Sequence, residues 1–164
     1  MEFPQALQIT DLLITLVTAM TPIGELRLAI PIAILKMDMQ WYFALPISIV
    51  GNMVPVLLIL VTLEKVTNIF TSFNNPVGRF LLWYRHRMLS MHTNKFQKYG
   101  AAALIVLVAI PLPMTGAWTG SFAAWLFHIP IKKAFSLISI GVIVAGVIVT
   151  TLSVAGVQFL SSGI

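Results

Sequence analysis

Two long apolar stretches without charged residues constrain this chain most. They run from 41 to 63 and from 135 to 160. A helix needs about 20 apolar residues to cross the roughly 30 Å hydrocarbon core of a bilayer, so each stretch is long enough. Hydrophobic residues make up 59% of the chain and charged residues 9%, which is too apolar for a soluble domain. The sequence therefore predicts an all-α integral membrane protein.

Each long stretch is preceded by two apolar arms that are too short to cross a bilayer. The first pair covers 6–20 and 26–35 and is joined by a Pro/Gly corner. The second pair covers 101–110 and 118–127 and is joined by the corner PLPMTG. No arm reaches the usual minimum of about 17 residues for a transmembrane helix. We therefore expect two re-entrant helical hairpins, and six short tilted spans are the alternative.

The two halves of the chain repeat the same order of hairpin and span. Pro22 matches Pro113 at an offset of 91 residues, and SIVG at 48–51 matches SIG at 139–141 at an offset of 90 to 91. A hairpin plus one crossing contains an odd number of crossings, so the second copy must enter the membrane from the other side. The sequence thus predicts two inverted repeats.

A basic linker separates the two repeats. We assign residues 1–63 to the first repeat, 64–100 to the linker and 101–164 to the second repeat. The linker has one acid, Glu64, among several Lys and Arg residues, and such loops stay cytoplasmic. Its apolar positions have helical spacing, which predicts an amphipathic helix on the membrane surface. They are Phe80, Tyr84, Met88 and Met91. Both termini are then expected outside.

The Pro/Gly corners place non-helical backbone at membrane depth, where only protein or a water-filled cavity can satisfy it. Inverted repeats with broken helices put this cavity near the midplane. After each corner a half-helix begins, and its free N–H groups attract anions. The corner residues are Pro22, Gly24, Pro111, Pro113 and Gly116. We expect Pro22 to be the first helical residue after Thr21, and Thr115 to cap the second half-helix.

Two charged residues follow the first corner in the stretch PIGELRLAIP. A carboxylate in a low dielectric tends to take up a proton, so we expect Glu25 to carry a coupling proton. Arg27 keeps its charge and has a forked shape that suits phosphate or carboxylate. Residues two apart on a helix face nearly opposite ways. Each charge should therefore find its own partner across the repeat interface, at Thr115, Trp118 or Thr119.

These residues also have a structural interpretation. Glu25 would complement the dipole of its own helix, and Arg27 would extend to the membrane interface. We favour a functional role for both, because ionisable groups inside membranes are rare and costly. Asn52 fits a helix-to-helix contact and a substrate contact equally well.

The residue inventory argues against several classes of function. The chain has no cysteine, and its histidines lack metal-site spacing. No nucleophile elbow, zinc-protease pattern or phosphate-binding loop occurs. We therefore expect no enzyme activity, cofactor, metal or nucleic-acid partner. The expected partners are membrane lipids, a small amphipathic or anionic lipid substrate, and protons or Na⁺. A chain this small can form a homodimer, although no helix face indicates where.

The stretches PIGELRLAIPIA and IPLPMTGAWTGSFAAWL carry a family resemblance. As a pair they resemble the prokaryotic small multi-drug export proteins, which implies a plasma-membrane protein that exports small toxic compounds. The hairpin layout is also similar to the DedA or VTT superfamily, whose members are associated with moving polyprenyl phosphate or phospholipids, often with proton coupling. That similarity implies roles for Glu25 and Arg27, although the second hairpin here has no arginine or acid.

The sequence therefore predicts a proton-coupled secondary transporter of small amphipathic compounds. The alternative is a translocase of polyprenyl phosphate or anionic phospholipid, and the third class is a channel or a non-transporting scaffold. Export of lipophilic cations would use Glu25 with Trp118 and Trp125 as aromatic walls. Translocation of an anionic headgroup would use Arg27 and the starts of both half-helices.

Overall fold

The computed structural model describes residues 8–72, 79, 83, 87, 94–110 and 115–161. Six helices lie within these ranges: α1 (Ile9–Met20), α2 (Glu25–Lys36), α3 (Trp41–Ser72), α5 (Asn94–Ala109), α6 (Ala117–Leu126) and α7 (Ile131–Ser161). The described residues contain no strand. The predicted all-α fold is therefore confirmed for this part of the chain.

Two of the helices are long enough to cross a membrane. They contain apolar spans over Trp41–Thr67 and Ile131–Phe159, with mean hydropathies of 2.3 and 2.5. By contrast, α1 and α2 have 12 residues each and α6 has 10. At 1.5 Å per residue these helices are about 15–18 Å long, or roughly half of a hydrocarbon core. The predicted order of two short helices before each long one is confirmed.

The helix ends depart from the prediction at both sides of the linker. α3 continues to Ser72 and α5 begins at Asn94, so both extend into the segment expected to separate the repeats. α7 begins at Ile131, so Lys132 and Lys133 lie in its first turn, ahead of the apolar stretch that begins at residue 135. A helix keeps its backbone hydrogen bonds where it leaves the membrane, and long lysine side chains reach water from it.

Of the predicted surface helix, the structure describes only Arg79, Trp83 and Arg87. Their backbone is helical and their side chains are exposed. The guanidinium carbon of Arg87 lies 5.5 Å from the centre of the Trp83 ring. Residues four apart share one helix face. The predicted apolar positions lie outside the described residues: Phe80, Tyr84, Met88 and Met91.

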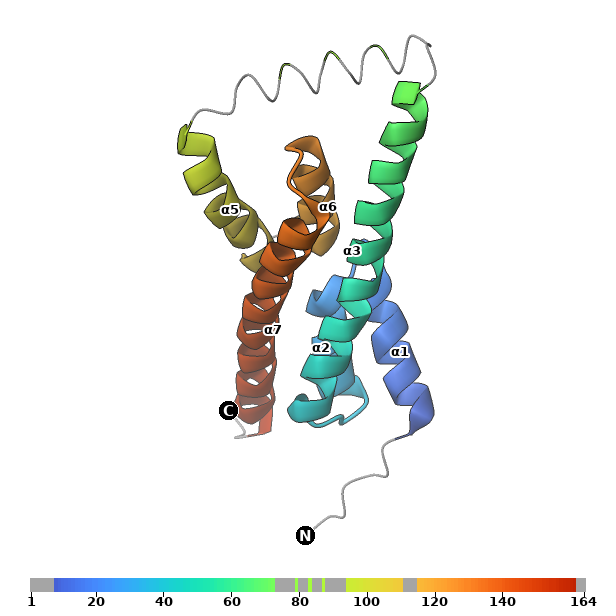
Figure 1. The fold of residues 1–164 in the computed structure, drawn as a ribbon. Helices are drawn as coiled ribbons and strands as arrows, with labels where there is room; N and C mark the ends of the chain where they lie inside the picture. Colours follow the sequence, from blue (N-terminus) through green and yellow to red (C-terminus); the bar gives the residue numbers. More distant parts are fainter. Residues whose placement is uncertain are drawn as a thin grey trace.

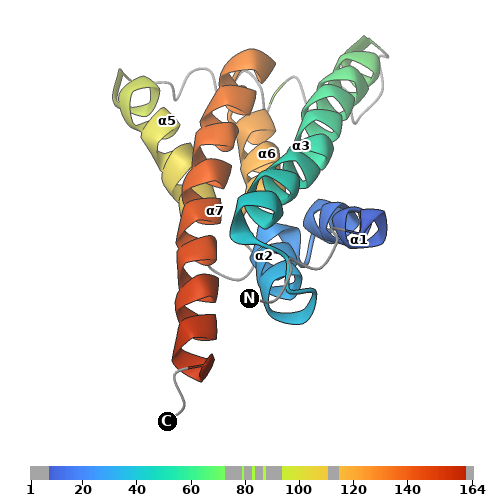
Figure 2. The same ribbon diagram turned by 90° about the horizontal axis from the view of Figure 1, so that it is seen from below.

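The two hairpins approach the middle of the molecule from opposite ends. In Figure 1, α1 starts at the lower end and α2 returns to it, whereas α5 starts at the upper end and α6 returns to it. The long helices α3 and α7 pack together and run in opposite directions. Seen from below in Figure 2, α1 lies outside α3 and α5 lies outside α7. Both α2 and α6 pack against the two long helices.

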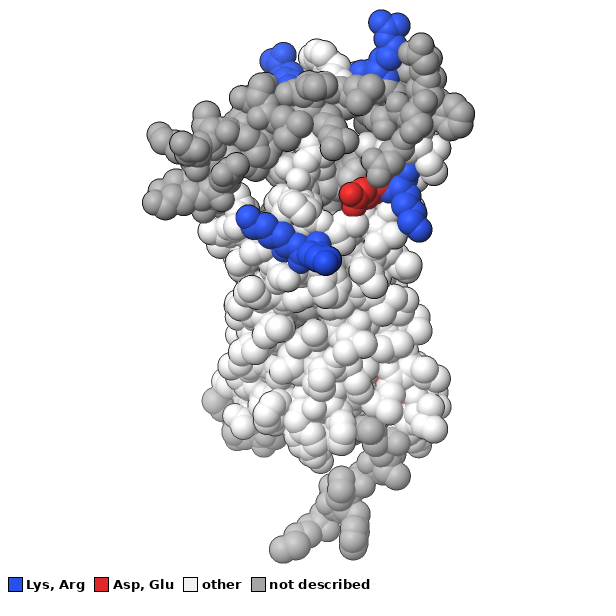
Figure 3. All heavy atoms as spheres, viewed as in Figure 1, with Lys and Arg blue, Asp and Glu red and all other residues white. Residues whose placement is uncertain are grey.

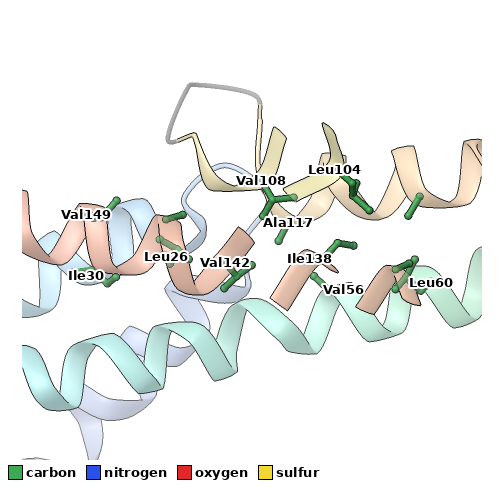
Figure 4. Close-up of a cluster of buried hydrophobic side chains, with 13 residues drawn as sticks. Leu26, Ile30, Val56, Leu60, Leu104, Val108, Ala117, Ile138, Val142 and Val149 are labelled. Atoms are coloured by element: carbon green, nitrogen blue, oxygen red, sulfur yellow. The ribbon is translucent and has the colours of Figure 1, made fainter. Parts of the chain in front are cut away.

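One apolar core joins the two halves of the chain (Figure 4). Its buried side chains come from α2, α3, α5, α6 and α7 and include Leu26, Ile30, Val56, Leu60, Leu104, Val108, Ala117, Ile138, Val142 and Val149. Small residues allow close approach between the helices. A Cβ atom at Gly51 would lie 2.6 Å from the carbonyl oxygen of Leu16, and one at Gly141 would lie 2.7 Å from Cβ of Val108. This packing holds the two hairpin corners against each other.

Basic side chains gather at one end of the molecule. On the face drawn in Figure 3, Lys and Arg lie toward the end where α3 stops and α7 starts, and the other half of this face shows none. The middle of the long helices is apolar even where it is exposed, as at Leu57, Leu58, Ile143 and Leu152. An apolar belt below a basic end suits a molecule surrounded by lipid.

Candidate functional site

The first hairpin corner is a turn held together by hydrogen bonds that Thr21 accepts. The backbone N–H of Glu25 donates to the carbonyl oxygen of Thr21 at 3.0 Å, and the N–H of Gly24 donates to Thr21 Oγ1 at 3.3 Å. These bonds fold residues 22–24 into a turn, so α2 begins at Glu25 and the prediction that Pro22 is its first residue was wrong. The N-cap residue of α2 is Gly24, without a side-chain capping bond, so Thr21 stabilises the turn and does not cap the helix.

Glu25 has an unusual backbone and a buried side chain. Its φ of 48° lies in the left-handed region, which costs roughly 1–2 kcal/mol for a residue with a Cβ atom. Its side chain is only 5% exposed. A buried carboxylate requires strong hydrogen-bond partners or a proton. Strain of this kind is often retained at functional positions.

The carboxylate of Glu25 receives its hydrogen bonds from the other half of the chain. The backbone N–H of Trp118 donates to Oε1 at 3.1 Å, and that of Ala117 donates to Oε2 at 3.3 Å. These are the first two residues of α6, whose free N–H groups and dipole favour an anion at this point. The predicted contact of Glu25 with the region of Trp118 is therefore present, and it uses the backbone.

Gly116 leaves the space that the Glu25 carboxylate occupies. A Cβ atom built at Gly116 would overlap Oε2 of Glu25 and lie 2.6 Å from its carboxyl carbon. Gly116 is the N-cap residue of α6, with φ of 157° and no side-chain capping bond. The prediction that Thr115 caps α6 was thus wrong. The cap is the carboxylate of Glu25, which reaches the helix from α2.

Arg27 binds the end of α5 and the second corner. Its Nη2 lies 3.5 Å from Oγ1 of Thr115 and 3.4 Å from the carbonyl oxygen of Ile110. Oγ1 of Thr115 also donates to that carbonyl at 3.1 Å. The predicted pairing of Arg27 with Thr115 across the two hairpins is present. Glu25 and Arg27 therefore each hold a different part of the second hairpin.

A pocket of about 460 Å³ lies where the two corners meet. Its walls are Pro22, Ile23, Gly24, Glu25, Arg27, Leu28, Thr115, Trp118, Thr119 and Phe122. The structure thus brings all five predicted binding residues together; their role in binding stays a prediction. The indole N–H of Trp118 donates to no acceptor among the described residues. The pocket therefore combines a carboxylate, a guanidinium and an indole N–H with apolar and aromatic walls.

Asn52, in α3, does not line this pocket. Its side chain is 1% exposed and interacts with the Glu25 carboxylate. Neither of its polar side-chain atoms has a well-formed hydrogen bond among the described residues. Asn52 therefore belongs to the site through Glu25.

Other predicted residues lie elsewhere. Trp125 faces α3, where its indole N–H donates to Oγ1 of Thr67 at 2.9 Å, and it lines a different pocket. It therefore forms no aromatic wall beside Glu25. Pro111 and Pro113 lie outside the described residues. The described residues contain no cluster of metal-ligating side chains.

Sequence reasoning expected free N–H groups at the start of this half-helix, but it missed that Glu25 accepts them, and it missed part of the apolar wall. The N–H groups of Ala117 and Trp118 carry no side-chain signal, and only a helix start after a glycine points to them. The spacing of Trp118 and Phe122 puts both on one face of α6, which is a signal that a helical-wheel count finds. Chemically, the site can hold a negative charge, exchange a proton and accommodate an apolar body.

A comparison with known protein families assigns this chain to one of them. Residues 25–148 match the sequence model of the family described as "Putative small multi-drug export protein". The matched range runs from Glu25 through the pocket and most of α7. Neither the curated proteins nor the solved structures gave a match. The chain is therefore a membrane protein that belongs to the small multi-drug export protein family.

Proposed function

We propose that this protein is a proton-coupled secondary transporter of small amphipathic compounds, with the pocket between α2 and α6 as the substrate site. One observation carries the proposal. The buried carboxylate of Glu25 joins the two hairpins by accepting the N–H groups of Ala117 and Trp118. An ionisable group that holds two moving parts together can couple its proton to their separation.

The coupling follows from what each charge state of Glu25 can bind. As a carboxylate it accepts both N–H groups and faces the positive end of the α6 dipole. As a neutral carboxyl it interacts more weakly with that dipole, so α2 and α6 are less firmly joined. Protonation then favours a state in which the two hairpins separate. The pocket can then open to the other side of the membrane. Transporters commonly use intramembrane carboxyl groups in this way.

The pocket walls fit an amphipathic substrate. Leu28 and Phe122 supply apolar surface, while Arg27 and the indole N–H of Trp118 supply donors. These donors favour a substrate with an acceptor or anionic group, which keeps polyprenyl phosphate or an anionic phospholipid as the second candidate. A forked guanidinium suits both phosphate and carboxylate.

Transport can be tested in proteoliposomes with an imposed pH gradient. We expect gradient-driven, saturable uptake of the substrate to be lost in Glu25→Gln, which cannot exchange a proton. The matched control is Glu64→Gln, because Glu64 is an exposed glutamate on α3 outside the pocket. Uptake that is equal in Glu25→Gln and wild type would contradict the coupling role. Flux without saturation would indicate a channel.

The substrate class can be tested by ligand-induced stabilisation. A ligand at about 100 times its dissociation constant raises the free energy of unfolding by roughly 2.7 kcal/mol. We expect polyprenyl phosphate to stabilise the wild type and to lose this effect in Arg27→Ala if the anionic substrate is right. Stabilisation by lipophilic cations alone, unchanged in Arg27→Ala, would favour cation export and reject the anionic substrate.

We also propose the membrane topology that the helix lengths support. In it, α3 and α7 cross a prokaryotic plasma membrane, each half of the chain is an inverted repeat of one re-entrant hairpin and one crossing, and the linker is cytoplasmic. The chain has no cysteine, so single cysteines can be introduced and labelled from each side. At Ile23, which is 93% exposed, a cysteine should react from the cytoplasmic side much more slowly than one at Arg79. Equal rates would mean that α1 and α2 cross completely.

A further inference from the structure

A further pocket, of about 400 Å³, lies between the start of α3 and the second half of α7. Both of these helix segments lie toward the lower end of Figure 1. The two helices are in close contact beside the pocket, because a Cβ atom at Gly146 would lie 2.8 Å from Cδ1 of Leu45. None of its walls lines the pocket between α2 and α6, so this α3–α7 pocket is a separate feature. The walls are Trp41, Leu45, Val147, Thr150, Thr151, Val154, Ala155 and Gln158.

The hydroxyl of Thr150 in this pocket lacks the hydrogen bond that its burial demands. Thr150 is 7% exposed, and its Oγ1 has no hydrogen-bond partner among the described residues. The hydroxyls of Thr151 and Ser153, on the same helix, each donate to the carbonyl oxygen four residues earlier at 2.8 Å. That bond satisfies a hydroxyl within its own helix. Thr150 does not form it, although an unpaired hydroxyl is costly in an apolar environment.

Helix packing does not require a hydroxyl at this place. At an offset of 90 residues between the two halves of the sequence, Thr150 corresponds to Leu60 and Trp41 corresponds to Ile131. Leu60 and Ile131 also line a pocket, which lies at the opposite end of the two long helices. Leu60 is 3% exposed and belongs to the apolar core. An apolar residue therefore serves for packing at the corresponding position, and the Thr150 hydroxyl points to a ligand.

The depth of Thr150 indicates what kind of ligand can reach it. At 1.5 Å per residue, Thr150 lies about 16 Å along α7 from the helix end at Ser161, or roughly half of a hydrocarbon core. The headgroup of a phospholipid stays at the membrane surface, and its acyl chains carry no hydrogen-bonding group at this depth. A ligand that satisfies Thr150 must therefore carry a polar group into the membrane on an apolar body. The pocket volume suits a small molecule.

We propose that the α3–α7 pocket is a second binding site for small, neutral amphipathic compounds, whose polar group forms a hydrogen bond with the Thr150 hydroxyl. Its walls include no charged residue, so a neutral compound is favoured over an ion. Rotation about χ1 exchanges the hydroxyl and methyl positions of Thr150, which lets the hydroxyl turn toward a ligand. Trp41 and Val147 are 52% and 50% exposed, so the ligand can enter from the surrounding lipid. The inference rests on the proposed function for the class of compound, and it adds a site outside the α2–α6 pocket.

Photolabelling of the full-length protein in detergent micelles tests this site. The probe is octanol that carries a diazirine, and the labelled residues are mapped by mass spectrometry. We expect label on residues 147–158, protection of this segment by unlabelled octanol, and much weaker protection by octane, which has no polar group. Val154→Trp should abolish the label, because the larger side chain fills the pocket. Label confined to the walls of the α2–α6 pocket would overturn the proposal, as would equal protection by octane.

A second variant tests the hydroxyl itself. Thr150→Val keeps the shape of the side chain, and it should raise the octanol concentration for half-protection about three- to tenfold through the loss of one hydrogen bond. Ser153→Ala is the matched control, because it removes a buried hydroxyl of α7 that bonds within the helix and does not line the pocket. An unchanged concentration in Thr150→Val would overturn the proposal. The transport assay separates the two ideas: absence of uptake by wild type rejects the proposed function, whereas an unlabelled α3–α7 pocket in a protein that transports rejects the second site alone.

Discussion

The two hairpins are built alike, but they contribute different chemistry to the pocket. The α1–α2 corner closes with its own hydrogen bonds, which Gly24 and Glu25 donate to Thr21. In the part of the α5–α6 corner that the structure describes, the N-cap residue Gly116 makes no side-chain capping bond, and Glu25 accepts the first two N–H groups of α6. The first hairpin therefore supplies charged side chains, and the second supplies backbone donors and the glycine that admits the carboxylate.

This difference shows how two helical hairpins can divide one site between them. At the offset of 91 residues that aligns Pro22 with Pro113, Glu25 corresponds to Gly116. These two residues are also in contact. In an arrangement with two-fold symmetry, residues next to the axis meet their own equivalents. A glutamate in one hairpin and a glycine in the other let the two corners interlock, which two glutamates could not do.

The largest effect should come from breaking that interlock at Gly116. We expect Gly116→Ala to lower the free energy of unfolding by about 2–4 kcal/mol, because the methyl group overlaps the Glu25 carboxylate and the backbone suits only glycine. Equilibrium unfolding in mixed micelles measures this. Gly156→Ala is the control, since a Cβ atom there meets nothing within 4 Å. An equal effect of both substitutions would contradict the interlock.

The pattern of long and short helices could be predicted because it depends on apolar length alone. A hydrocarbon core sets the length of a crossing helix, and the Pro/Gly corners mark where the short arms turn. The helix ends at Ser72 and Asn94 were missed, since a helix that leaves the membrane can continue through polar sequence. No apolar pattern records where it stops.

The side chains of the site were easier to predict than its geometry. Glu25 and Arg27 stand out because charge inside a membrane is costly. The cap of α6 by Glu25 could not be predicted, because it joins residues 25 and 117 through backbone groups that every residue has. Local capping preferences instead assigned the cap to Thr115, the nearest hydroxyl. In the structure, the tertiary contact with Glu25 takes the place of that local cap.

Removing the carboxylate should have the next largest effect. We expect Glu25→Ala to lower the free energy of unfolding by about 2 kcal/mol, since two N–H groups at the start of α6 lose a charged acceptor. The same unfolding assay applies, with Glu64→Ala as the exposed control on α3. If Glu25→Ala were as stable as wild type, α6 would not depend on the first hairpin, and the division between the hairpins would fail.

The glycine of the first corner should matter less than that of the second. A Cβ atom at Gly24 would lie 2.9 Å from Oγ1 of Thr21, which is a side-chain atom that can rotate away. The backbone at Gly24 has φ of −92°, which any residue adopts. We therefore expect Gly24→Ala to cost about 1 kcal/mol or less. A cost equal to that of Gly116→Ala would mean that the two corners are equally constrained, and the contrast between them would disappear.

The smallest expected effect is a coupling energy, which should distinguish the two corner threonines by the residues that they contact. Among the described residues, the Thr21 hydroxyl binds only within its own hairpin, to Thr18 and Gly24, whereas Thr115 accepts a hydrogen bond from Arg27 of the other hairpin. Each Thr→Val change should cost about 0.5–1.5 kcal/mol. The distinguishing quantity is their coupling to Arg27→Ala in a double-mutant cycle. For Thr115→Val the two costs should fail to add by about 0.5 kcal/mol or more, because one change already removes the shared bond. For Thr21→Val they should add within error, and coupling there instead would show that the first corner also depends on the second hairpin.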